Sequence, residues 1–144
     1  MKTILVLIAL AIGAAACTPS ANYKTERDEV MKYHDTVMQG HAQVVNNQLK
    51  LDTLLRSLSD LKRRQPQIDT LKEKVTMNET LVRLHKAEGL MNKWMQEFEP
   101  DITGKSEAAA LAYFKAEQVK IAAIDSIYKS EINLSTNYLL KFRQ

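Results

Sequence analysis

Methionine and histidine recur at helical spacing in one segment of the sequence, in the pattern Met31-x-x-His34-x-x-x-Met38-x-x-His41. On a helix that turns by about 100° per residue, these four side chains fall within about 80° of one another. Thioether and imidazole ligands suit Cu(I), so the pattern predicts a candidate copper site. The four positions span about 15 Å at about 1.5 Å per residue, so one ion would contact only part of the set.

A second segment supplies sulfur and aromatic side chains at similar spacing. If the chain reverses near residue 66, position i of a first helix faces about position 131 − i of a second, which brings His34 level with about residue 97 and His41 with about residue 90. A second reversal near residue 103 brings Phe114 level with Met91 and Glu117 level with Glu88 by the same argument. The resulting layer has these candidate metal ligands: His34, Met38, His41, Met91 and Met95. It has these core residues around them: Asp35, Trp94, Phe98 and Phe114.

Core packing accounts for the same residues without a metal. Methionine fills irregular core gaps and packs well against aromatic rings such as that of Trp94. A histidine at such a seam is satisfied by a carboxylate, and Asp35 flanks His34 while Glu88 lies near His41. A haem held between Met and His is a further alternative, although three closely packed helices leave little room for a macrocycle. The sequence therefore predicts no cofactor, with copper as the alternative.

Long helices are needed to position this layer. The chain of 144 residues has only 4 Gly and 3 Pro, and it is rich in Leu, Lys, Glu, Ala and Gln, as long helices are. Apolar stripes predict three helices, over about 23–64, 67–99 and 106–142. Asn22 or Thr25 is expected to begin the first helix, Pro66 to lie in the first turn of the second, and Ser106 to cap the third.

Short turns between these helices make chain neighbours antiparallel. The expected fold is therefore all-α, an elongated antiparallel three-helix bundle with coiled-coil-like packing. The alternative is one continuous helix kinked at Pro66, which would require a dimer.

Cys17 closes an apolar run at the N-terminus. Lys2 provides a charged start, residues 4–16 are apolar or small, and three alanines precede the cysteine. This is the anatomy of a bacterial lipoprotein signal peptide, in which residues 1–16 are removed and Cys17 is diacylated. The run is shorter than the roughly 20 residues that span a bilayer. Cleavage after Ala16 without lipidation fits the small-residue rule too, but the lone cysteine in the first mature position favours lipidation.

The chain thus divides into a signal peptide (1–16), a lipidated cysteine with a short tether (17–22) and a helical bundle (23–144). Thr18 follows the cysteine, where an aspartate would favour retention in the inner membrane. No acidic residue lies just after the cysteine, which favours the periplasmic face over surface export. We expect an outer-membrane lipoprotein of the cell envelope, facing the periplasm.

Composition excludes several classes of function. Loss of Lys2 with the signal lowers the formal net charge from +3 to about +2, which is no nucleic-acid footprint. Cys17 is the single cysteine, so no disulfide forms within the chain. The sequence has no P-loop, G-x-G-x-x-G, H-E-x-x-H or nucleophile elbow, so we expect no enzyme. A binding, scaffold or envelope-accessory role is expected, with the membrane and an unidentified envelope protein as partners and a monomer or homodimer as the assembly.

The two segments of the predicted layer also carry a resemblance. Residues 31–38 contain M-x-x-H-D-x-V-M, and residues 91–98 contain M-x-x-W-M-x-x-F. Together with the signal peptide and the length, they resemble small helical lipoproteins of the Bacteroidota, often called "viral A-type inclusion protein" after coiled-coil similarity. The resemblance implies a helical lipoprotein with no catalytic residues. Gly89 departs from it where an alanine is expected, and the missing side chain would leave space beside His41.

Overall fold

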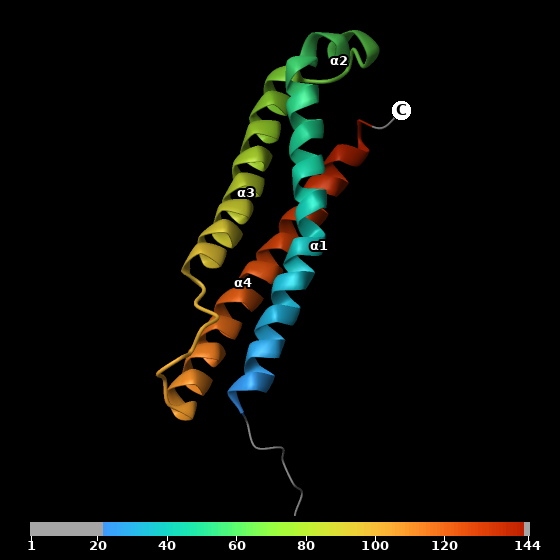
Figure 1. Cartoon of the computed structure of the whole chain (residues 1–144). Helices are drawn as coiled ribbons and strands as arrows, with labels where there is room; N and C mark the ends of the chain where they lie inside the picture. The colour runs from blue at the N-terminus through green and yellow to red at the C-terminus, as the bar shows by residue number, and fades with distance from the viewer. Residues whose placement is uncertain (1–21, 143–144) are drawn as a thin grey trace, which may run out of the picture.

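A computed structural model describes residues 22–142, which are all-helical and contain no strand. The helices are α1 (Tyr23–Arg56), α2 (Leu58–Arg64), α3 (Thr70–Glu97) and α4 (Glu107–Leu140). The three long helices lie side by side, and the short α2 lies at the end opposite to the start of α1 (Figure 1). The expected signal peptide and Cys17 fall outside the described residues.

Side-chain caps fix the starts of the long helices. The Asn22 side chain accepts a hydrogen bond from the Thr25 amide at 3.0 Å, so Asn22 is the N-cap of α1. Ser106 accepts one from the Ala109 amide at 3.2 Å, as expected for α4. Each cap satisfies an amide that has no partner within its helix.

The expected start of the second long helix at Pro66 is wrong. Asp69 is the N-cap of α3, because its carboxylate accepts hydrogen bonds from the Leu71 and Lys72 amides, both at 3.1 Å. Lys62 donates from Nζ to the carbonyls of Pro66 and Ile68, at 2.9 and 2.7 Å, and closes the preceding turn. The chain reverses there (Figure 1), which excludes the continuous helix kinked at Pro66.

The expected single helix over 23–64 is divided at Ser57 into α1 and α2, which gives four helices instead of three. The Ser57 hydroxyl donates to the Thr53 carbonyl at 2.8 Å, and its amide bonds the carbonyls of both Thr53 and Leu54. An amide shared between the carbonyls three and four residues earlier is common at a helix end. Ser57 leaves helical geometry, with φ −110° and ψ 24°.

The register between α1 and α3 matches the expectation. The rings of His34 and Trp94 lie 6.1 Å apart, and His41 faces Glu88, so the antiparallel pairing holds to within about one turn.

The register between α3 and α4 differs from the expectation. Glu117 bonds Trp94 instead of lying level with Glu88. The reason is that the chain after Phe98 is extended and runs along α4, where the Glu99 amide donates to the Tyr113 hydroxyl at 2.7 Å (Figure 1). The reversal is therefore not symmetric about residue 103.

The most extensive helix contact is between α1 and α4, which run in the same direction. Near its start, α1 meets α4 through Tyr23 and Phe114, whose rings lie 6.4 Å apart, and further along Asn47 bonds Ser135. Every seventh residue of α1 is buried in the core: Val30, Val37, Val44 and Leu51. This spacing gives α1 a narrow apolar seam between α3 and α4.

Candidate ligand-binding site

The α1–α3 seam holds the predicted ligands, but its histidines have separate partners. His34 Nδ1 lies 3.0 Å from Asp35 Oδ1, with its ring beside Trp94. His41 Nε2 lies 4.0 Å from Glu88 Oε1. No three His, Cys, Asp or Glu side chains gather into a metal-binding group within residues 22–142. Any metal site in this seam would therefore depend on methionine.

The methionines of the seam differ in exposure. Met91 is buried in the core, with 1% of its surface accessible. Met38 on α1 is 37% exposed, and Met95 on α3 is 39% exposed. The exposed methionines thus lie on both helices that bring His34 and Trp94 together, with Met31, at 37%, as exposed as Met38.

The predicted core residues lie in one aromatic cluster, except Asp35. The rings of Trp94 and Phe98 stack at 4.7 Å, and Phe98 lies 6.3 Å from Phe114. Asp35 lies outside this cluster, with its side chain exposed.

A buried carboxylate adjoins this cluster and is fully paired. Glu117 accepts from Trp94 Nε1 at 2.9 Å and from Lys120 Nζ at 2.7 Å. The hydrogen bond to Glu117 raises the pKa of Lys120. Each oxygen of the Glu117 carboxylate therefore has one donor.

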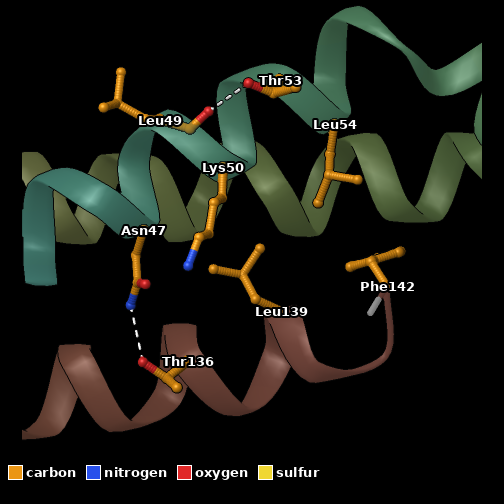
Figure 2. Close-up of a pocket in the computed structure, with 8 residues that line it drawn as sticks. All are labelled: Asn47, Leu49, Lys50, Thr53, Leu54, Thr136, Leu139 and Phe142. Atoms are coloured by element: carbon orange, nitrogen blue, oxygen red, sulfur yellow. Dashed lines mark hydrogen bonds between the residues drawn. The ribbon is translucent and has the colours of Figure 1, made fainter. Parts of the chain in front are cut away.

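A cavity of about 360 Å³ lies between the C-terminal half of α1 and the last turns of α4 (Figure 2). We call it the α1/α4 cavity. Leu54, Leu139 and Phe142 supply its apolar walls. The remaining lining residues are Asn47, Leu49, Lys50, Thr53 and Thr136. A mostly apolar cavity with a few polar groups is the usual form of a small-molecule site.

The floor of the α1/α4 cavity is a polar bridge between its two helices. Asn47, only 1% exposed, donates from Nδ2 to Ser135 Oγ at 2.8 Å and to Thr136 Oγ1 at 3.0 Å. Its Oδ1 accepts from Gln43 Nε2 at 2.7 Å. The amide of Asn47 thus has no donor left for a ligand.

Lys50 supplies the charge of the α1/α4 cavity. Its ammonium points into the space between the two helices (Figure 2). No carboxylate of residues 22–142 forms an ion pair with it. The cavity therefore offers one cation among apolar walls.

The α4 side of the cavity is fixed to α3 by Glu73. Its Oε2 accepts from Tyr138 Oη and from Lys141 Nζ, both at 2.5 Å. Burial opposes ionisation of Glu73, but these hydrogen bonds outweigh it and lower its pKa. Burial, together with the bond to Glu73, raises the pKa of Tyr138. Phe142 packs edge-on against Tyr138 at 5.4 Å, so this network also orients one wall.

The sequence analysis did not identify the α1/α4 cavity. The signal available in the sequence was Asn47, a polar residue three positions after Val44 on the apolar seam of α1. A polar residue at a core position needs partners on another element. Locating those partners on α4 requires the α1–α4 pairing, which joins segments far apart in the chain.

No helix within residues 22–142 has an apolar stretch long enough to cross a membrane. Comparison with known proteins gives no relative: no family model matches the chain, and no curated protein or solved structure is significantly similar to it.

Proposed function

We propose that this protein is a lipid-anchored, non-catalytic binding protein of the cell envelope, tethered to the outer membrane through acylated Cys17. Its three long helices serve as an elongated bundle, with coiled-coil-like packing, that presents a small-molecule site. The observation that supports binding is the α1/α4 cavity, with Lys50 directed into it. Asn47 and Glu73 support the site by joining the surrounding helices.

The anchor is tested with Cys17→Ser. This variant should leave the membrane fraction and appear in the soluble periplasmic fraction, because the acceptor of the diacyl group is gone. Its helical circular dichroism should be unchanged, since Cys17 precedes the packed core. Intact-mass measurement of the unmodified protein should show the diacyl addition on a chain that begins at Cys17. Unmodified protein that is soluble, or that carries no diacyl mass on Cys17, would contradict the anchor.

The binding role is tested by filling the α1/α4 cavity. Native mass spectrometry of the Cys17→Ser protein, isolated from its own envelope, should show a non-covalent small-molecule adduct. Adding Leu54→Trp should remove the adduct, because the larger ring occupies the space between the walls. Leu134→Trp is the matched control, since Leu134 is 51% exposed on α4 and does not line the cavity. An adduct that survives Leu54→Trp, or no adduct at all, would contradict binding at this site.

A second candidate function is Cu(I) binding in the α1–α3 seam. It is favoured by the exposed Met38 and Met95, which lie on the two helices that bring His34 and Trp94 together. His41 and Met91 are further candidate ligands in this seam. Haem binding by the same Met and His residues is the less favoured version of this second function. Anaerobic Cu(I) titration should then give stoichiometric binding that is lost in His34→Leu/Met38→Leu with helicity intact. If the protein does not bind Cu(I), and if His34→Leu stabilises it, the α1–α3 seam serves only for core packing.

A further inference from the structure

We infer that the α1/α4 cavity takes a fatty acid, a single-chain amphiphile with an anionic head. In this arrangement the carboxylate pairs with the ammonium of Lys50, and the acyl chain lies against Leu54, Leu139 and Phe142. The inference rests on the proposed binding function and specifies its ligand.

The charge of the cavity selects the head group. Among residues 22–142, Lys50 is the one charged residue of the lining, and these residues place no carboxylate in it. Lys50 is exposed at the edge of the cavity, so a neutral ligand would gain nothing from its charge, and a cation would be repelled. A carboxylate supplies both the charge and the acceptors that the ammonium needs.

The other polar groups of the lining disfavour a ligand rich in hydroxyls or amides. The Asn47 amide already donates to Ser135 and Thr136. The Thr53 hydroxyl donates to the Leu49 carbonyl at 2.8 Å. A sugar or nucleotide would therefore bury polar groups without partners, which is costly. An acyl chain needs no such partners.

The size of the cavity selects one chain. Its volume of about 360 Å³ is near the lower end of the roughly 300–1,000 Å³ typical of small-molecule sites. The walls come from two helices and leave one trough between them (Figure 2). This room suits one acyl chain better than the paired chains of a phospholipid.

The probe is dodecanoate, titrated below its micellar concentration into the Cys17→Ser protein by isothermal calorimetry. We expect saturable one-to-one binding, at least about tenfold tighter than that of dodecyltrimethylammonium. Lys50→Gln should weaken dodecanoate binding by at least about tenfold. Lys86→Gln, an exposed lysine on α3 outside the cavity, should not change it. Leu54→Trp should abolish binding, and melting curves confirm that each variant is folded.

Each result has a distinct meaning. Equal binding of both amphiphiles, or no effect of Lys50→Gln, would overturn the anionic head while leaving the cavity as a binding site. Binding that survives Leu54→Trp, or that never saturates, would place dodecanoate on the surface and overturn the inference. If dodecanoate does not bind but the native adduct still disappears with Leu54→Trp, the ligand class is wrong and the proposed function holds. Loss of both observations would overturn both proposals.

Discussion

Tyr128 lies at the centre of the α1–α4 contact with 1% of its surface exposed. Its hydroxyl has no hydrogen-bond partner among residues 22–142. Burial, with a smaller effect from the charge of Glu88, raises its pKa to about 12. A buried unpaired hydroxyl costs about 1–3 kcal/mol of folding stability. The hydroxyl of Tyr128 therefore offsets part of the stabilisation that burial of its ring provides.

Tyr128→Phe should therefore raise the free energy of unfolding, by up to about 1 kcal/mol. Tyr138→Phe is the matched control and should lower it, because the Tyr138 hydroxyl donates to Glu73. Urea denaturation monitored by circular dichroism measures both. If Tyr128→Phe destabilised the protein as much as Tyr138→Phe, the Tyr128 hydroxyl would have a partner such as a buried water.

The residue types in the sequence predict well which side chains are buried. They do not predict where the packed helices leave a cavity. Trp94, Phe98 and Phe114 were expected in one core, and they form one aromatic cluster. Lys50 carries no such signal, since a lysine on a helix normally keeps its ammonium in water. Its role depends on the space left by α4, which no local pattern records.

At the scale of elements, the helices were predictable where a side chain caps them. Asn22 and Ser106 mark the starts of α1 and α4 as expected. Ser57 was missed because its residue type does not mark a break. Ser126 likewise donates its hydroxyl to the carbonyl four residues earlier, yet α4 continues through it. The α3–α4 register was missed because turn arithmetic assumes a compact turn, whereas the chain after Phe98 is extended.

Two mid-helix glycines offer a test at this scale. A Cβ added at Gly89 would meet no atom within 4 Å, so Gly89 lies on an open face of α3 and not beside His41. Gly89→Ala should stabilise the protein by up to about 1 kcal/mol through helix propensity.

Gly40→Ala is the comparison. Its Cβ would lie 3.1 Å from Ile132 Cδ1 across the α1–α4 contact, so the same gain in propensity is offset by displacement of Ile132. Gly40→Ala should therefore stabilise less than Gly89→Ala, or destabilise, in urea denaturation. Equal gains would mean that α1 and α4 separate easily at this level.

For the whole molecule, Glu73 joins the start of α3 to the end of α4. Its pKa is lowered in the folded state from an ordinary value of 4.5. A carboxylate of this kind contributes its stabilisation fully above that ordinary value, and the contribution is lost as the pH falls through the folded pKa. Acid should therefore loosen the contact between these two helix ends.

Glu73→Gln should reduce the loss of stability between about pH 5 and pH 3. Unfolding free energies from urea titrations at several pH values measure this slope. Glu79→Gln, an exposed residue on the same helix, should keep the slope of the unmodified protein. Identical slopes for all three proteins would show that Glu73 does not contribute to acid sensitivity.

The direction of α1 has a geometric consequence. Its start at Asn22 follows the tether, and the α1/α4 cavity adjoins Lys50. At about 1.5 Å per residue, the cavity lies about 40 Å along α1 from its first residue. If the protein is anchored through Cys17 and binds a ligand in this cavity, as proposed, an upright molecule would hold that ligand in water beyond the lipid headgroups. Loading and unloading would then occur by hand-over to a second carrier, and the length of α1 would set the distance at which the two meet.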